Sequence, residues 1–298
     1  MTEWTGVGGR RVLITGATNG IGLAAAEALA ALGAELAIVA RSQARASAAV
    51  ARIEAAGGGG TTVDVLLADL ASQASVRRLA AEVLARYPRL DVLVNNAGAI
   101  YMTHQMTEDG VELTWAVNHL APFLLTTLLL ERLKESAPAR VVTTASIAHM
   151  GTRIPFDDLG GERTYARRHL AGRGYPRYGQ TKLANILFSA ELARRLEGTG
   201  VRANCFHPGL VASGFNRNNG ALMNVAMTIM KPFARSPRKG AETLVWLVDS
   251  PDAAGETGGY FEDRRRVAPS AEAQDAETAR RLWEVSEAQT RVSATANR

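Results

Sequence analysis

The sequence of 298 residues contains one cysteine, Cys205, in the apolar run VRANCF. A single cysteine excludes an intramolecular disulfide, and a cysteine in such a run is typical of a small core residue rather than a nucleophile. The redox compartment is unmarked, so we take the cytoplasm as the default localisation. Histidine is also scarce, and His104, His149 and His169 lack metal-ligand spacing, so we expect no metal.

Long hydrophobic runs and clusters of one charge are missing as well. The longest apolar run, LAPFLLTTLLL, is shorter than the roughly 20 residues that cross a bilayer. The N-terminal sequence MTEWTGVGGRRVLITG has no basic segment followed by an apolar one, so we expect neither a signal peptide nor a membrane span. The net charge is +5, but lysine and arginine are scattered, so nucleic-acid binding is not expected.

Apolar runs of strand length alternate with segments of helical period. The strand-like runs are 11–15, 35–40, 62–68, 91–95, 140–145 and 201–206, and the helix-like segments are 21–32, 43–56, 72–86, 111–134 and 178–196. Such alternation predicts parallel strands joined by right-handed helical crossovers. We therefore expect a single α/β domain over residues 1–298, a doubly wound parallel β-sheet with helices on both faces, whose first five strands are buried on both sides.

The rest of the chain is less regular. GGGG at 57–60 is interpreted as a loop. The long loop 149–177 is expected to wall a substrate site. Residues 213–239 mix Gly, Asn, Met and basic residues, and they form either a lid over a substrate or a core helix; their place after the sixth strand favours the lid. A helix at 240–249, a short strand near 257–261 and a C-terminal extension over 262–298 complete the prediction.

The sequence VLITGATNGIG places Gly16, Gly20 and Gly22 between the first strand and an alanine-rich helix. Glycine lets a pyrophosphate approach the backbone closely, and the helix N-terminus offers free N–H groups to an anion. The strand before, the helix after and a second strand about 20 residues on are the context that a dinucleotide-binding turn requires. The turn residues expected at the cofactor are Gly16, Thr18, Asn19, Gly20, Ile21 and Gly22.

The end of the second strand favours one dinucleotide. An acidic residue there would bind the ribose 2′-hydroxyl of NAD, whereas a cation accommodates the 2′-phosphate of NADP. The sequence VARSQAR supplies Arg41 and Ser42 and no acid. We expect NADP(H) to be preferred over NAD(H); the alternative is that Arg41 only caps a strand end.

The segment RYGQTKLANILF places Tyr178 and Lys182 four residues apart, on one helix face. A ketone that accepts a hydride develops alkoxide charge, and a positioned acid lowers that barrier. Bringing a phenol of pKa near 10 to neutrality takes roughly 4 kcal/mol of differential stabilisation. A nearby ammonium is a plausible source, so we expect Lys182 to lower the pKa of Tyr178.

The spacing Gly-xxx-Gly-x-Gly, the sequence NNAG at 95–98 and Tyr-xxx-Lys at 178–182 resemble the short-chain dehydrogenase/reductase family. The resemblance runs from about residue 10 to about residue 288. VNHLAPFLLT, IPFDDL, KLANILF, HPGLV and GGYFEDRRRVAPS are similar to its retinol dehydrogenase-like branch. The family implies one NAD(P)-binding Rossmann domain and an oxidoreductase.

The resemblance also implies residue roles. Around the cofactor it places Asp69 and Leu70 by the adenine, Asn96, Ala97 and Gly98 by the adenosine ribose, and Pro208, Gly209, Val211 and Ser213 by the carboxamide, with Ser213 where the family usually has Thr. In catalysis it makes Tyr178 the general acid/base, Lys182 its partner and a ribose ligand, Ser146 the group that binds the substrate carbonyl, and Asn118 the holder of a relay water. His119 and His207 are expected to be structural.

Each catalytic residue alone has a structural interpretation, as a helix-start aromatic, a solvated charge, a strand-end hydroxyl or a core amide. Their joint order and spacing favour catalysis. Apolar residues of the two long segments suggest a pocket for a lipophilic or bulky carbonyl or alcohol: Ile154, Phe156, Tyr165, Leu222, Met223, Met227 and Met230. The alternative is a catalytically silent dinucleotide sensor of the same fold. A homo-oligomer through 111–133 and 178–196 is possible, unless the C-terminal extension covers that face.

Overall fold

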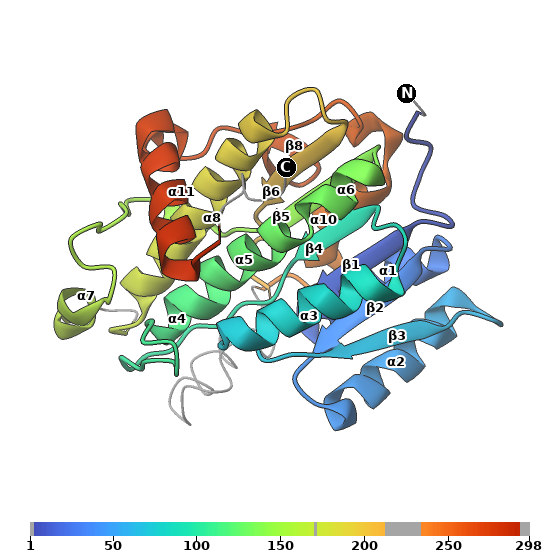
Figure 1. Cartoon of the computed structure of the whole chain (residues 1–298), viewed down its shortest axis with the longest axis horizontal. Helices are drawn as coiled ribbons and strands as arrows, with labels where there is room; N and C mark the ends of the chain where they lie inside the picture. The colour runs from blue at the N-terminus through green and yellow to red at the C-terminus, as the bar shows by residue number, and fades with distance from the viewer. Residues whose placement is uncertain (1–2, 170–171, 212–233, 293–298) are drawn as a thin grey trace.

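The computed structural model describes residues 3–169, 172–211 and 234–292. Its centre is an eight-stranded sheet of order β3-β2-β1-β4-β5-β6-β7-β8, parallel except for the last pair (Figure 1). The strands are β1 Arg11–Thr15, β2 Glu35–Ala40, β3 Val63–Leu67, β4 Val92–Asn95, β5 Ala139–Thr144, β6 Val201–Phe206, β7 Tyr260–Glu262 and β8 Arg265–Val267. The expected doubly wound parallel sheet is confirmed, and its strand order reverses between β1 and β4, where such folds bind ligands.

Helices cover both faces because alternate strand residues point to opposite sides. Leu13 joins one buried cluster with α3 (Gln73–Arg86), α5 (Ala121–Leu128) and α8 (Tyr175–Arg195). Val12 and Ile14 join the other with α1 (Gly20–Ala31), α2 (Gln43–Gly57) and α10 (Pro237–Asp249). The two apolar layers hold the carboxyl ends of β1, β4, β5 and β6 side by side.

The structure corrects the expectation that the first five strands are all buried on both faces. β3 forms one edge of the sheet, and β2 is its one partner among the described strands; its last residue, Leu67, is 52% exposed. At the opposite edge, β8 returns antiparallel to β7 through Asp263 and Arg264, both of which have positive φ. An apolar run does not distinguish an edge strand from a central one.

The single helix expected over 111–134 is wrong. The chain instead forms α4 (Leu113–Trp115), a π-helical turn η1 (Ala116–Leu120), α5 and α6 (Leu130–Glu135). Pro122 has no N–H to donate to the carbonyl of Asn118, so the regular α-helical pattern cannot continue through this point. The π-helical turn carries Asn118, one of the expected site residues.

The long loop 149–177 contains a short helix, α7 (Glu162–Ala166), and packs closely on the domain. Ile154 and Tyr165 are buried, and Arg281 lies over the Phe156 ring at 4.0 Å. These three side chains therefore take part in packing, which corrects their assignment as walls of an open pocket. Helix α10 begins at Pro237, so the end of the expected lid is helical; its residues 213–233, with Leu222, Met223, Met227 and Met230, lie outside the described residues.

The C-terminal extension ends in α11 (Ala276–Thr290), which packs along α8 (Figure 1). Trp283 of α11 stacks on Phe188 with ring centres 5.9 Å apart and meets the edge of Phe123 at 5.0 Å. This face of α8 was expected to be covered either by a second copy of the chain or by the C-terminal extension. In this structure the extension covers it. Oligomeric state stays a prediction.

Candidate active site

The glycine-rich turn closes tightly on the neighbouring strands. Gly16 and Gly20 have φ values of +70° and +55°, which L-residues rarely adopt. A Cβ on Gly22 would lie 2.3 Å from the Gly16 carbonyl oxygen and 2.4 Å from Asn96 Nδ2. Asn96 Nδ2 donates to the carbonyls of Thr15 and Gly16 at 3.1 and 3.2 Å. The three glycines are thus required where the sequence places them.

The N-terminus of α1 points its backbone N–H groups out of this turn. Asn19 is the N-cap in an extended conformation, and its side chain makes no capping hydrogen bond. The N–H groups of the first turn and the positive end of the helix dipole suit an anion. Residues 16–22, which include Thr18 and Ile21, therefore form a cradle that fits a dinucleotide pyrophosphate.

Arg41 and Ser42 stand at the carboxyl end of β2. Arg41 is exposed and forms no ion pair with any described residue, and the remaining segments contain no Asp or Glu. Ser42 is the N-cap of α2, and its hydroxyl makes no capping bond. Burial raises the pKa of Tyr101; the charge of Arg41 opposes that shift, and those of Asp69 and Glu112 add to it. Arg41 and Asp69 therefore flank the same region of the sheet edge.

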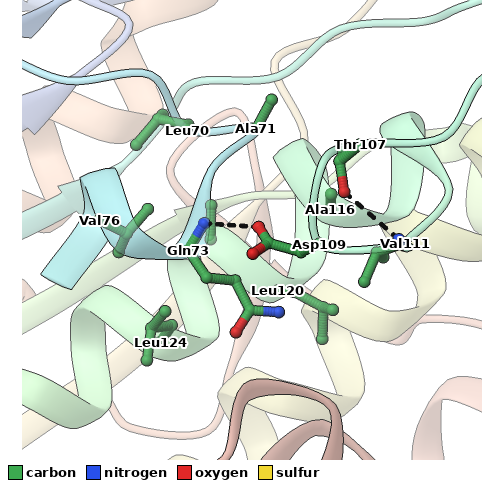
Figure 2. Close-up of a pocket in the computed structure, with 11 residues that line it drawn as sticks. Leu70, Ala71, Gln73, Val76, Thr107, Asp109, Val111, Ala116, Leu120 and Leu124 are labelled. Atoms are coloured by element: carbon green, nitrogen blue, oxygen red, sulfur yellow. Dashed lines mark hydrogen bonds between the residues drawn. The ribbon is translucent and has the colours of Figure 1, made fainter.

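Leu70 lines a small cavity between α3, α5 and the turn at 107–111 (Figure 2). The Asp109 carboxylate accepts from the Gln73 backbone N–H at 2.8 Å and closes one side of it. Its volume of about 10 Å³ is about one water molecule's worth of space. This cavity is too small for an organic substrate.

Asn118 is buried and paired on both sides of its amide. Its Oδ1 accepts from the Ala99 N–H at 2.8 Å, and its Nδ2 donates to the Ala99 carbonyl at 2.8 Å and to Thr181 Oγ1 at 3.1 Å. A Cβ on Gly98 would lie 3.3 Å from Asn118 Oδ1 and 3.6 Å from Lys182 Nζ. The backbone after β4 therefore meets two expected catalytic residues, Asn118 and Lys182.

Ser146 lies just beyond β5 and begins the short helix η2 (Ile147–His149) as its N-cap. Its Oγ accepts from the Ala148 N–H at 3.2 Å, and its side chain hydrogen-bonds to that of Tyr178. Tyr178 lies on the first turn of α8, because Pro176 and the Gly174 carbonyl start that helix three residues before it. The serine and the phenol thus meet from two different elements.

Lys182 follows Tyr178 by one turn of α8 and is buried. Its Nζ donates to the Thr144 carbonyl at 3.0 Å and lies 5.4 Å from the centre of the Tyr178 ring. Burial lowers the pKa of Lys182 to about 8. Lys182, Tyr178 and Ser146 therefore form one group at the carboxyl end of β5.

The expected depression of the Tyr178 pKa by Lys182 does not hold in this arrangement. Burial raises the pKa of Tyr178, the hydrogen bond with Ser146 lowers it, and the neighbouring Tyr175 raises it further. The reason is that the ammonium of Lys182 turns to the Thr144 carbonyl and lies over the face of the ring. Its own charge is also disfavoured by burial.

The loop after β6 is braced from the C-terminal side. Gly209 has a φ of +80°, and Val211 pairs with Arg235 in an isolated parallel bridge. Arg235 forms a two-pronged ion pair with Asp263 at 2.5 and 3.0 Å. Pro208, Gly209 and Val211 therefore have fixed backbone positions, whereas Ser213 lies outside the described residues.

Exposed apolar side chains near Ser146 come from other positions than the sequence suggested. Ile147 and Met150, in and after η2, are 52% and 54% exposed, and Leu210, after β6, is 49% exposed. Sequence reasoning also missed Thr15, whose hydroxyl accepts from the N–H groups of Asn96 and Ala97 at 3.0 and 3.1 Å. The position of Thr15 in the sequence could have identified it, because Thr15 is the last residue of β1 and directly precedes Gly16.

His119 behaves as a structural group. His119 is buried, its Nε2 lies 2.9 Å from Ser286 Oγ, and burial lowers its pKa to about 3. In residues 3–169, 172–211 and 234–292 no three His, Cys, Asp or Glu side chains gather to hold a metal ion. Over the same ranges, none of the helices combines the length and apolar character that a membrane span needs.

Comparison with known proteins agrees with this geometry. Residues 10–155 match the family described as short chain dehydrogenase. Retinol dehydrogenase 14 of Mus musculus is 42% identical over 294 residues, 94% of this chain and 85% of that protein. A candidate daunorubicin C-13 ketoreductase of Streptomyces sp. strain C5 is 43% identical over 96% of this chain and 94% of that protein.

A solved structure with a cofactor shares the fold. The short chain dehydrogenase of Burkholderia cenocepacia J2315 in complex with NADP is 29% identical, with a TM-score of 0.66 over 86% of this chain and 96% of that one. The retinol dehydrogenase identity extends over nearly the whole chain, and the solved structure shares the α/β fold. The chain belongs to the short-chain dehydrogenase/reductase family of oxidoreductases, in its retinol dehydrogenase-like branch.

Proposed function

We propose that this protein is an NADP(H)-dependent oxidoreductase that interconverts a carbonyl and an alcohol on a lipophilic or bulky substrate, with Tyr178 as general acid/base. The observation that carries the proposal is the joint position of Ser146, Tyr178 and Lys182. Ser146 bonds to Tyr178, and Lys182 lies over the ring of the same tyrosine. All three stand at the carboxyl edge of the sheet, where open α/β folds bind their ligands.

NADPH held by the cradle of residues 16–22 would supply the hydride to the carbonyl carbon. Ser146 Oγ holds the substrate oxygen beside the Tyr178 hydroxyl, and that hydroxyl donates its proton as charge develops on the oxygen. Lys182, with a pKa of about 8, is mostly protonated at neutral pH, and its ammonium lies over the ring of the same tyrosine. Asn118 touches the backbone of Ala99 and the hydroxyl of Thr181, and it fixes the inner end of the proton path.

The preference for NADP(H) rests on Arg41. Its guanidinium is exposed at the end of β2 without an acidic partner among the described residues. A free guanidinium and the adjoining Ser42 hydroxyl suit a 2′-phosphate, and no carboxylate follows β2 to repel it. Titration with NADPH and NADH tests this part alone, and equal dissociation constants would contradict it.

The substrate class rests on the exposed apolar side chains beside Ser146. Ile147, Met150 and Leu210 present about half of their surface to solvent, which suits a large apolar molecule better than a small polar one. The names of two relatives, a retinol dehydrogenase and a candidate daunorubicin ketoreductase, are consistent with bulky lipophilic substrates. A polyene aldehyde and a polycyclic ketone are therefore the first probes.

The experiment is a substrate panel with purified protein. NADPH oxidation is followed with carbonyl compounds that range from small aliphatic aldehydes to retinal-sized and polycyclic ones. We expect kcat/KM to rise with apolar size. Tight NADPH binding with no turnover on any compound would instead favour the catalytically silent dinucleotide sensor.

A further inference from the structure

One peptide group of the candidate active site is held by two histidines. The carbonyl of Ser146 lies 2.8 Å from His149 Nδ1, and the N–H of Ile147 lies 3.3 Å from His207 Nδ1. These two atoms belong to the same peptide unit, between Ser146 and Ile147. Because a trans peptide points its C=O and N–H in opposite directions, the two imidazoles hold this plane from its two sides.

The hydrogen bonds fix the protonation of each ring. A carbonyl only accepts, so Nδ1 of His149 carries its proton, and Nε2 accepts from the Ser270 N–H at 3.1 Å. His207 is the reverse: its Nδ1 accepts from Ile147 and also from the Gly209 N–H at 3.2 Å. Its proton therefore lies on Nε2, 3.6 Å from Glu262 Oε1. The two histidines are neutral and carry their protons on opposite nitrogens.

We propose that His149 and His207 are positioning residues, which orient the hydroxyl of Ser146 by clamping the Ser146–Ile147 peptide between two neutral imidazoles of opposite tautomer. The proposal rests on the proposed function, because it assigns Ser146 to the substrate oxygen. The same bonds join distant parts of the site. His149 connects Ser146 to Ser270 of the C-terminal extension, and His207 connects Ile147 to Gly209 of the loop after β6.

The surroundings favour the neutral forms at neutral pH. His149 is fully buried, its ring meets that of Tyr260 edge-on at 5.2 Å, and the charge of Glu272 acts on it. Burial lowers the pKa of His149 despite the hydrogen bond that the ring donates to the Ser146 carbonyl and despite the charge of Glu272.

His207 has more charged neighbours, and burial again is the largest influence on it. Burial lowers the pKa of His207; Glu262 and Asp263 oppose that shift, whereas Arg235 and His149 add to it. Both imidazoles therefore titrate below their usual range.

Protonation would break the clamp at identifiable bonds. A second proton on His149 would place an N–H against the N–H of Ser270, and a second proton on His207 would place one against the N–H groups of Ile147 and Gly209. Two N–H groups that face each other cannot form a hydrogen bond, so the imidazole and the backbone would move apart or rotate. Turnover is therefore expected to fall on the acid side as the Ser146 peptide is released.

Substitution by asparagine or glutamine tests the two ring nitrogens one at a time. The side-chain amide of Asn reaches the position of Nδ1, and that of Gln reaches the position of Nε2. His149→Asn keeps a donor for the Ser146 carbonyl, and His207→Asn keeps an acceptor for the Ile147 N–H. We expect each Asn variant to keep kcat within about threefold, and each Gln or Ala variant to lose about 10- to 100-fold, since small misplacements of reacting groups have effects of that size.

Two readouts distinguish positioning from general structural damage. The Asn variants have no titratable ring, so each should weaken the acid limb of the kcat profile, and NADPH affinity should stay unchanged in the His149 series. Asn and Gln variants of equal kcat, or an acid limb that neither Asn variant changes, would overturn the inference.

The tautomers provide a test that does not depend on turnover. Nuclear magnetic resonance of isotope-labelled imidazole nitrogens should place the proton on Nδ1 of His149 and on Nε2 of His207, and the same tautomer in both would contradict the clamp. If the wild-type protein turns over no carbonyl substrate, the proposed function fails instead. The tautomer result then shows separately whether the clamp exists.

Discussion

Lys182 Nζ donates to the Thr144 carbonyl at 3.0 Å and lies 5.4 Å from the centre of the Tyr178 ring. Asn185 Nδ2 donates to the same carbonyl at 3.2 Å. Both donors lie on α8, so Asn185 alone would still join this helix to the Thr144 carbonyl at the end of β5. Burial disfavours this ammonium, so its charge costs stability.

Replacing Lys182 by methionine should stabilise the protein at pH 7. The pKa of Lys182 is lowered from 10.5 to about 8, so the charged form opposes folding below pH 8, and that opposition disappears as pH rises toward 10.5. We expect Lys182→Met to raise the free energy of unfolding by about 1–3 kcal/mol at pH 7, with the gain shrinking above pH 8. Urea unfolding at pH 7 and pH 10 measures it. Lys239→Met, in an exposed pair with Glu242, is the control and should change little.

Arg41 should decide between the two dinucleotides. Arg41→Ala is expected to weaken NADPH binding by about 10- to 100-fold, the value of a charge-assisted hydrogen bond, and to leave NADH binding unchanged. Fluorescence titration of both cofactors gives the two constants. Arg45→Ala, also exposed and on α2, is the matched control. An equal loss for NADPH and NADH would remove Arg41 from phosphate recognition.

Gly22 should tolerate no side chain. Gly22→Ala places a Cβ 2.3 Å from the Gly16 carbonyl, so the turn must shift; we expect a loss of about 1–3 kcal/mol in stability and weaker binding of both dinucleotides. Gly59→Ala is the control, because no atom of the described residues lies within 4 Å of a Cβ there. Thermal unfolding and cofactor titration of the two variants check this. Wild-type affinity in Gly22→Ala would contradict the assigned pyrophosphate cradle.

The buried pair of Arg177 and Glu112 should be the ion pair whose loss matters most for stability. Arg177 Nε lies 2.8 Å from Glu112 Oε2, both side chains are fully buried, and Tyr165 also donates to Glu112 at 2.9 Å. Arg177→Met leaves an uncompensated carboxylate, so we expect a loss of about 3–5 kcal/mol. Chemical denaturation measures it against Arg163→Met, whose pair with Asp157 is exposed. Equal stability of the two variants would contradict this ranking.

Much of the architecture was predictable because it depends on local patterns. The six main strands lie within a residue of the apolar runs, since buried strands require continuous apolar sequence. The break in the helix at Asn118 could not be predicted in this way. Pro122 marks its position, but the helical period of residues 111–134 continues across the π-helical turn. The edge position of β3 depends on the order of strands, which no single run encodes.

The site divides in the same way. The positions of Ser146, Tyr178 and Lys182 follow from motif order, and the structure brings them together. The direction in which Lys182 points depends on the Thr144 carbonyl, 38 residues away in the sequence, and the His149 bond to Ser270 spans 121 residues. Contacts of that range arise from the packed fold rather than from any local spacing.

The Tyr178 hydroxyl is expected to carry the proton of carbonyl reduction. The most direct measurement compares NADPH oxidation by wild-type protein and Tyr178→Phe on the best bulky ketone or aldehyde of the panel, with NADPH affinity measured in parallel. Tyr87→Phe, which removes a hydroxyl bonded to Asp64 at the start of β3, is the control. We expect Tyr178→Phe to bind NADPH normally and to lose about 100- to 10,000-fold in kcat, with Tyr87→Phe near wild type. Near wild-type turnover in Tyr178→Phe would contradict the account.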